Sequence, residues 1–183
     1  AEEDIISLAT KASKKVLKSE KNIDAIILIT QTPKYNIPSN SFIIQKKLNI
    51  QKNCLVFDIN QGCSGYIYGL KVAEGLLNSK KINKVLLITA DNYSRYCKKL
   101  NVKLLFSDCA TATLLVKAKN KLKFNFFSDG NNYNYLCQEN DNYSKLPGHT
   151  FIKGYYKAYA EFIGADSEEV VNCYLNYLEN STK

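Results

Sequence analysis

Apolar residues along the chain alternate between helical spacing and short continuous runs. Residues 3–17 and 64–78 repeat apolar positions every three to four residues, which predicts amphipathic helices. Residues 23–30, 53–58 and 84–90 are short apolar or β-branched runs, which predict interior strands. A further helix is predicted to open at Pro38-Ser39 and to end before Asn49. Strands that alternate with helices at this spacing predict parallel βαβ units, and therefore an α/β fold.

The pattern changes after residue 91. Residues 91–103 are a polar connection for which at most one helical turn is predicted. Three strands separated by short turns follow, which favours antiparallel pairing; they are predicted at residues 103–106, 110–117 and 121–127. Residues 130–149 are predicted to form a polar loop insertion. Residues 151–178 are predicted to be helical, with a break at 164–167 where Ser167 caps the last helix ahead of two acidic residues.

One segment joins a predicted strand to a predicted helix and leaves a cysteine on the turn between them. Cys63 is expected at the N-terminus of the helix, where unpaired N–H groups and the macrodipole favour an anion and raise the fraction of thiolate. Gly62 and Gly65 are expected to let a substrate approach the backbone. These local features are compatible with a reactive nucleophile and equally with a packed core thiol.

Residues 58–70 (DINQGCSGYIYGL) resemble the nucleophile segment of the thiolase-fold condensing enzymes, most closely the ketoacyl-ACP synthase III type, with its D-I-x-x-x-C-S-G-x-x-Y-G-L pattern. Four further matches follow the family's order, at residues 32–39 (TPKYNIPS), 90–95 (ADNYSR), 105–110 (LFSDCA) and 128–130 (SDG). Together they cover essentially the whole chain. The resemblance implies the N-terminal half of a thiolase-like fold, a mixed sheet with helices on both faces.

The resemblance implies that Cys63 accepts an acyl group from acyl-CoA, after which malonyl-ACP loses carbon dioxide and condenses with it to give 3-oxoacyl-ACP. Ile152 and Gly154 resemble the tunnel-lining M-x-G segment and are expected to bind substrate. No cofactor or metal is implied beyond the substrates acyl-CoA and malonyl-ACP. The expected partners are an acyl carrier protein and a second copy of the chain, paired through residues 53–57.

Two of the family's motifs, P-H-Q-x-N and G-x-G-N-T, do not occur in the 183 residues. There is also no Met, and no counterpart of the family's opening strand. We therefore interpret residues 1–183 as a single partial domain of a longer protein. His149 is the single histidine, but it precedes Ile152 and Gly154, whereas the family's base follows that segment, so we interpret it as a loop residue without a catalytic role.

The chain also departs from the family pattern. Ser107, Cys109 and Thr111 replace glycines of G-D-G-A-G-A, which leaves the local backbone geometry open, and Asp108 is expected to serve structure. The D-R-x-T stretch that helps hold coenzyme A is replaced by K-L-N-V at residues 99–102, which leaves the donor and its binding mode open. Tyr35 and Tyr66 are interpreted as core residues rather than channel lining.

Three alternatives stay open at this point. The first is an enzyme of the same fold that transfers the acyl group to an amine or hydroxyl without decarboxylation. The second is a catalytically silent half-domain that contributes a dimerisation surface. The third is a basic RNA-binding module, which the helical and strand periodicity of the tyrosines disfavours.

Composition reduces the number of functions that are compatible with the chain. The formal net charge of +8 comes almost entirely from scattered lysines, and the single arginine, Arg95, argues against bidentate readout of nucleic acid. Most lysines are expected on solvated faces, although a basic surface that attracts an acidic carrier protein is compatible with them. Six cysteines without a C-x-x-C pair and one histidine argue against a zinc cluster. No run approaches a membrane span and no signal peptide is recognised, so a soluble cytoplasmic protein is expected.

Overall fold

The computed structural model describes residues 3–95, 106–119, 122–131, 157, 160 and 166–181. The chain divides into two compact units, residues 1–95 with 107–127 and residues 96–106 with 128–183. The first unit carries the sheet and three helices of nine or more residues. No helix within the described ranges is long and apolar enough to cross a membrane.

A four-stranded mixed sheet forms the centre of the first unit. Its strands are β1 (Ala25–Ile29), β2 (Leu55–Ile59), β3 (Lys84–Asp91) and β4 (Cys109–Val116). Their order is β2-β1-β3-β4. β1 pairs in parallel with β2 and with β3, whereas β4 runs antiparallel to β3. The parallel βαβ units are therefore confirmed. Of the strands predicted after residue 91, the one at residues 110–117 is observed, and it pairs antiparallel with β3 rather than with another of the predicted strands.

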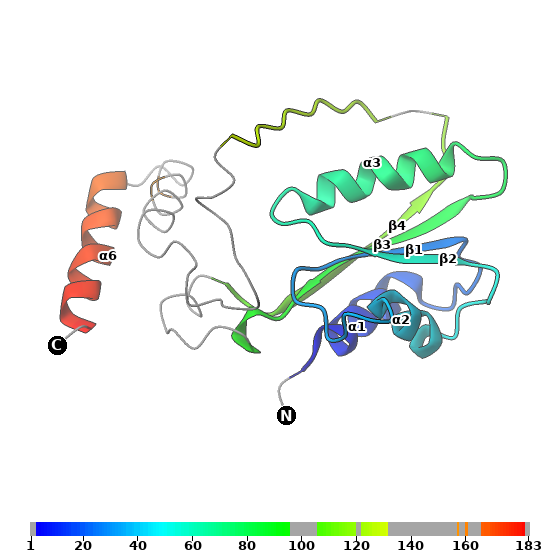
Figure 1. Cartoon of the computed structure of the whole chain (residues 1–183), viewed down its shortest axis with the longest axis horizontal. Helices are drawn as coiled ribbons and strands as arrows, with labels where there is room; N and C mark the ends of the chain where they lie inside the picture. The colour runs from blue at the N-terminus through cyan, green and yellow to red at the C-terminus, as the bar shows by residue number, and fades with distance from the viewer. Residues whose placement is uncertain are drawn as a thin grey trace. The chain divides into compact units, whose positions relative to one another are not determined.

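Helices cover both faces of this sheet (Figure 1). They are α1 (Ile5–Leu17), α2 (Asn40–Leu48) and α3 (Gly65–Leu77). Figure 1 shows α1 and α2 on one face and α3 on the other. Each face has its own apolar core: Ile26 and Leu28 of β1 point toward α1 and α2, and Ile27 and Ile29 point toward α3. The expected layered α/β architecture is thus observed, and the continuous apolar run of β1 reflects burial on both faces.

β2 corrects the prediction of an interior strand at residues 53–57. It lies at an end of the described sheet, and the side chain of Leu55 is 46% exposed. A short apolar run cannot distinguish an interior strand from an edge strand, because the run records apolar faces and not the number of hydrogen-bonded neighbours. Within the described sheet, β2 has a hydrogen-bonded neighbour on one side only.

The strand predicted at residues 121–127 is also wrong. Residues 122–127 are described and belong to no strand. They run instead beside α3 (Figure 1), where the rings of Tyr68 and Phe126 lie 5.2 Å apart and Lys71 Nζ lies 5.2 Å from the ring of Phe124. Alternation places Phe124 and Phe126 on one side of an extended chain, and here that side faces a helix rather than a strand. Residues 103–105 of the other predicted strand lie outside the described residues.

The last helix belongs to the second unit. α6 (Ser167–Ser181) begins where the break was predicted, and Glu168 and Glu169 form its acidic first turn. Its cap is not Ser167, however. Asp166 Oδ1 accepts hydrogen bonds from the backbone N–H of Glu168 at 2.8 Å and of Glu169 at 3.1 Å. A carboxylate one residue earlier reaches two unpaired N–H groups of the first turn, which a side chain inside the helix cannot do. The loop predicted at residues 130–149 is described only at 130 and 131.

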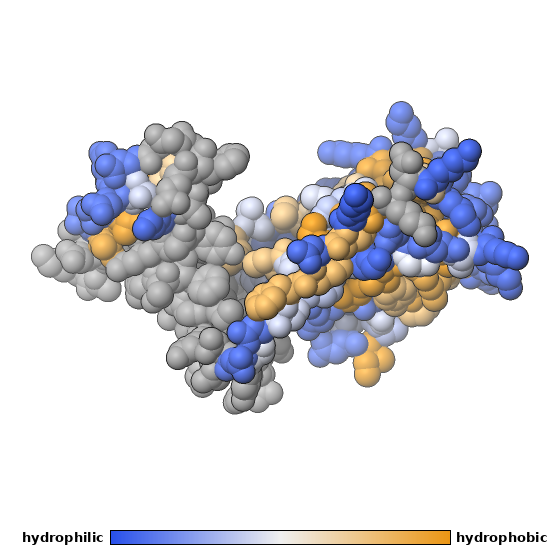
Figure 2. All heavy atoms as spheres, turned by 90° about the horizontal axis from the view of Figure 1, so that it is seen from above, coloured by the Kyte–Doolittle hydropathy of each residue, from blue (hydrophilic) through white to orange (hydrophobic). Residues whose placement is uncertain are grey.

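Figure 2 looks onto the α3 side of the first unit and shows apolar residues interrupting the hydrophilic surface. α3 contributes Tyr66, Ile67 and Val72, which are between 37% and 46% exposed. A helix that is apolar on more than its core face is typical of a helix covered on two sides. The α3 side is therefore a second candidate surface for association, in addition to the edge of β2.

Small residues let α3 approach the sheet closely. Gly65, Gly69 and Ala73 recur every four residues, and all three are buried. A methyl group added at Gly69 would lie 2.5 Å from Ile29 Cδ1 and 2.8 Å from Leu87 Cδ1. Ile29 and Leu87 are themselves almost completely buried, so their terminal methyl groups would have to shift within a packed core.

We predict that Gly69→Ala lowers the free energy of unfolding by about 1–2 kcal/mol, because overpacking at the helix–sheet contact destabilises the fold by more than the higher helix propensity of alanine stabilises it. Gly75→Ala is the matched control on the same helix, since a methyl group there would meet no atom within 4 Å. It should raise stability by about 0.5–1 kcal/mol. Urea unfolding followed by circular dichroism measures both. Equal stabilisation by the two substitutions would show that α3 does not pack against the sheet at Gly69.

Candidate active site

The turn between β2 and α3 places Cys63 at the surface, one residue before Ser64, which directly precedes the helix. The Gly62 carbonyl accepts a hydrogen bond of 2.7 Å from the Gly65 backbone N–H, so that Cys63 lies inside a tight turn. Ser64 is held by its neighbour, because Gln61 Nε2 donates to Ser64 Oγ at 3.0 Å. The predicted position of the cysteine beside the start of a helix is confirmed, and the thiol there is exposed rather than packed in the core.

The two glycines of the turn lie against other parts of the protein. A methyl group at Gly65 would lie 2.6 Å from Ile29 Cγ2, and one at Gly62 would lie 3.3 Å from Gln31 Oε1. Their predicted role of letting a substrate approach the backbone stays a prediction. Gly65 is needed for the close packing of α3 on the sheet, and Gly62 lies against a side chain that follows β1.

Asp58 links the cysteine segment to α2. Its carboxylate accepts hydrogen bonds from the backbone N–H groups of Asn40 at 2.6 Å and Ser41 at 3.0 Å, at the N-terminus of α2. The buried Asn40 side chain in turn accepts from the backbone N–H groups of Lys34 and Tyr35, both at 3.1 Å. Asp58 thus holds the loop of residues 32–39 in place. Sequence reasoning missed this role, although an acidic residue at the carboxyl end of a strand was visible.

Asp91 forms a second node, at the carboxyl end of β3. Its Oδ1 accepts four hydrogen bonds of 2.8–3.1 Å, from the hydroxyl of Thr30, the backbone N–H of Gln31, and both the N–H and the hydroxyl of Thr32. Thr32 Oγ1 also accepts from the Asn92 backbone N–H at 2.8 Å. The carboxyl ends of β1 and β3 are therefore tied together beside the cysteine turn. This node was not predicted either.

Asp108 has the structural position expected of it. Its Oδ1 accepts from the Ser94 backbone N–H at 2.9 Å and its Oδ2 accepts from the Ser94 hydroxyl, within the short 3-10 helix Tyr93–Arg95. The departures from G-D-G-A-G-A leave an ordinary strand: in β4, Thr111 is hydrogen-bonded to Thr89 through hydroxyl groups 2.8 Å apart.

His149, Ile152 and Gly154 lie outside the described residues. Tyr35 and Tyr66, predicted to be core residues, are 45% and 37% exposed, and the Tyr66 hydroxyl lies 3.3 Å from that of Thr113. In the described part of the chain, no group of three or more His, Cys, Asp or Glu side chains could hold a metal ion.

The described cysteines differ in environment. Burial, with a smaller contribution from Asp24, raises the pKa of the half-buried Cys54 to about 11. Cys63, Cys109 and Cys173 are exposed. Cys54 is therefore almost entirely protonated at neutral pH, and it provides an internal reference for the reactivity of Cys63.

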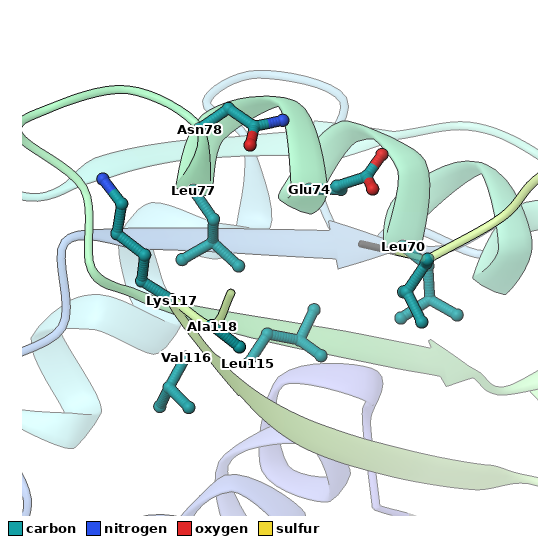
Figure 3. A pocket seen from close by; sticks show the side chains of 9 residues that line it. Leu70, Glu74, Leu77, Asn78, Leu115, Val116, Lys117 and Ala118 are labelled. Carbon is teal, nitrogen blue, oxygen red and sulfur yellow. The ribbon is translucent and has the colours of Figure 1, made fainter. Parts of the chain in front are cut away.

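A pocket of about 230 Å³ lies between α3 and the end of β4 (Figure 3). Its lining is mostly apolar, with Leu70, Leu77 and Leu115 on its walls and Glu74 at its rim. None of the lining residues belongs to the cysteine turn, and the lining from α3 begins at Leu70, beyond the helix's first turn. The pocket is therefore not lined by the turn that carries Cys63.

Comparison with known proteins gives two family matches. The model of the family 3-Oxoacyl-[acyl-carrier-protein (ACP)] synthase III matches residues 57–130, which include the cysteine turn, α3, β3 and β4. A helix-turn-helix domain model matches residues 138–170, of which the structure describes only Lys157, Ala160 and residues 166–170.

Similar proteins agree with the first match. The beta-ketoacyl-[acyl-carrier-protein] synthase III of Clostridium botulinum strain 657 is 34% identical over 190 residues, covering 93% of this chain and 57% of its own length. The crystal structure of the Aquifex aeolicus VF5 3-oxoacyl-[acyl-carrier-protein] synthase III has a TM-score of 0.60 at 35% identity, covering 66% of this chain and 41% of that one. The Pseudomonas aeruginosa PAO1 enzyme shares the fold with a TM-score of 0.73 at 22% identity, over 86% of this chain and 53% of its own.

The chain spans little more than half the length of the Clostridium relative. Three observations agree: the motif of the cysteine segment, the mixed sheet with helices on both faces, and the similarity to these proteins. The chain belongs to the 3-oxoacyl-ACP synthase III family.

Proposed function

We propose that Cys63 is the acyl acceptor of an acyltransferase of the 3-oxoacyl-ACP synthase III type. The observation that carries this proposal is the exposed thiol in the turn that directly precedes α3, within a segment that matches the family's nucleophile pattern. The start of a helix favours a thiolate, and the thiolate is the nucleophilic form. No other described cysteine lies at the start of a helix.

In the first half-reaction, the Cys63 thiolate attacks the carbonyl carbon of an acyl thioester, usually acyl-CoA. The tetrahedral intermediate collapses, the bond to the donor's sulfur breaks, and that sulfur leaves as a thiolate that takes up a proton. Negative charge develops on the former carbonyl oxygen, and the Cys63 backbone N–H is one donor that stabilises it. The product is an acyl-enzyme thioester.

The second half-reaction needs groups that these 183 residues do not supply. In the longer protein, malonyl-ACP loses carbon dioxide, and the resulting carbanion attacks the acyl thioester to release 3-oxoacyl-ACP and regenerate the thiol. The enolate oxygen is stabilised by the His and Asn of the family's two later motifs, neither of which occurs in this sequence. One alternative is that the same acyl-enzyme transfers its acyl group to an amine or hydroxyl without decarboxylation. The other is a catalytically silent half-domain that forms no acyl-enzyme and contributes a dimerisation surface.

Two partners follow from this function. An acyl carrier protein is acidic, and the lysines of this chain, with a net charge of +8, would attract it. A second copy of the chain would pair through residues 53–57, which include the start of β2. The backbone N–H of Leu55 donates to the Asp24 carbonyl, so it points toward β1. Because N–H groups alternate in direction along a strand, those of Val56 and Asp58 point toward the opposite edge of β2.

We predict that iodoacetamide alkylates Cys63 faster than the other five cysteines at neutral pH. Cys54 should be slow and should accelerate roughly tenfold per pH unit up to pH 9, because its thiolate fraction rises in that proportion below a pKa of about 11. Limited alkylation followed by peptide mapping measures each site. Earlier labelling of Cys97 or Cys137 would mean that Cys63 is not activated in this chain.

We predict that the 183-residue chain becomes slowly acylated at Cys63 by acyl-CoA and forms no 3-oxoacyl-ACP with malonyl-ACP. Losing even one donor to a developing oxyanion lowers the rate on the order of a hundred- to a thousandfold, and here both family donors are missing. Mass analysis of the chain and of the carrier protein after incubation tests both statements. Cys63→Ser is the control that should lose acylation. Condensation at an enzymatic rate would contradict the prediction and make His149 the first residue to replace.

We predict a homodimer at roughly tens of micromolar, the range in which interfaces of this kind act. Val56→Pro should return it to a monomer in multi-angle light scattering, because proline removes a donor from the open edge of β2 and leaves the bonds to β1 intact. Leu114→Pro makes the same kind of change in β4, the strand at the opposite end of the described sheet, and should leave the dimer unchanged.

Circular dichroism should show that both variants keep their secondary structure. If Leu114→Pro rather than Val56→Pro dissociates the dimer, association runs through β4. A wild-type chain that is monomeric at this concentration would exclude the interface altogether.

A further inference from the structure

Gln31 connects three segments that are far apart in the sequence. It follows the end of β1 by two residues, and its backbone N–H donates to Asp91 Oδ1 at 2.8 Å. Its side-chain Oε1 accepts a hydrogen bond of 2.8 Å from the Tyr93 hydroxyl. The backbone of Gln31 is thus held by the end of β3, and its side chain is held by the short helix that follows β3.

The amide group of Gln31 lies against Gly62. A methyl group added at Gly62 would lie 3.3 Å from Oε1, 3.4 Å from Nε2 and 3.5 Å from Cδ of Gln31. All three atoms of the amide therefore lie within 3.5 Å of this position. An alanine at position 62 would displace the amide by a few tenths of an ångström.

Gly62 is the first residue of the turn that contains Cys63. Its carbonyl accepts the 2.7 Å hydrogen bond from Gly65 that closes the turn. Gln61 holds the other side of the turn through Ser64 Oγ. The position of Gly62 therefore determines where the turn, and with it the Cys63 thiol, lies relative to the carboxyl ends of β1 and β3.

We propose that Tyr93 and Gln31 form a brace that positions the Cys63 turn, so that both are positioning residues for the acyl-accepting thiol. This inference rests on the proposed function of Cys63. Neither residue belongs to the fixed positions of the family pattern: Gln31 precedes the T-P-x-Y-x-x-P-S segment, and Tyr93 occupies a variable position of A-E-x-x-S-R. The brace is therefore a feature of this chain's own side chains.

The brace acts by restricting motion. The Gln31 side chain is exposed, and an exposed glutamine ordinarily samples several rotamers. The hydrogen bond from Tyr93 selects the rotamer that contacts Gly62. Without it, the turn loses a contact on one side, the thiol spends less time at the start of α3, and its reactivity falls.

The experiment compares alkylation of Cys63 by iodoacetamide at pH 7 in the full 183-residue chain and its variants, with Cys54 as the reference within each molecule. Gln31→Ala should slow Cys63 about three- to tenfold and Tyr93→Phe about twofold, in line with the sensitivity of reactive groups to small displacements. The control is Gln45→Ala, which removes a half-buried glutamine whose Nε2 donates to the Gln51 carbonyl at 2.8 Å. It should leave Cys63 unchanged. The Cys54 rate should stay the same in all three variants.

A second pair of variants tests the contact itself. Gly62→Ala should slow Cys63 in the wild-type background, because the added methyl group displaces the Gln31 amide. In the Gln31→Ala background the same change should slow it no further, because the obstructing amide is gone. Non-additivity of this kind shows that the two positions act through one contact.

The proposal is overturned if Gln31→Ala labels Cys63 at the wild-type rate, or if the effects of Gly62→Ala and Gln31→Ala simply multiply. It is also overturned if Cys54 and Cys63 change together in Tyr93→Phe, which keeps the ring, since that result indicates a general loss of stability. Alkylation requires no acyl donor. Failure of acyl-CoA to acylate the wild-type chain therefore refutes the proposed function, whereas these rates refute or support the brace separately.

Discussion

The close contact between α3 and the sheet is the constraint on which the rest of the structure depends. Gly65 and Gly69 face Ile29 and Leu87 at distances that no additional carbon atom could occupy. Because the helix lies this near to β1 and β3, its N-terminus arrives at the carboxyl ends of these strands. A larger residue at either glycine would lift the helix and separate the Cys63 turn from the segments that it contacts.

The carboxyl ends of the parallel strands are organised by carboxylates that serve as hydrogen-bond acceptors. Asp58 holds the start of α2, and Asp91 binds the backbone and hydroxyl groups that follow β1. Ionised acceptors form stronger hydrogen bonds than neutral ones, so each aspartate can order a loop with little packing of its own. In open α/β sheets this edge is where ligands bind. Here it is also where the family motifs meet.

The sequence by itself determined the class of architecture and the position of Cys63. Periodicity identified β1, β3, β4 and α1 to α3 with boundaries close to those observed, because burial on one or two faces leaves a direct record in residue order. The cysteine followed from the same logic: a residue between an apolar run and a helical repeat must lie on a strand-to-helix turn. The resemblance of residues 58–70 then indicated the family to which the chain belongs.

Tertiary structure decided what depends on partners distant in sequence. Residues 121–127 alternate like a strand, yet they extend along α3, since alternation records only which side is covered and not by what. β2 is predicted to be interior but lies at an edge of the described sheet, because hydrogen-bonded neighbours leave no trace in composition. Gln31 and Gly62 are 31 positions apart in the sequence. Only the packing of α3 on β1 brings them into contact, so no local pattern could have shown that one of them supports the turn of the other.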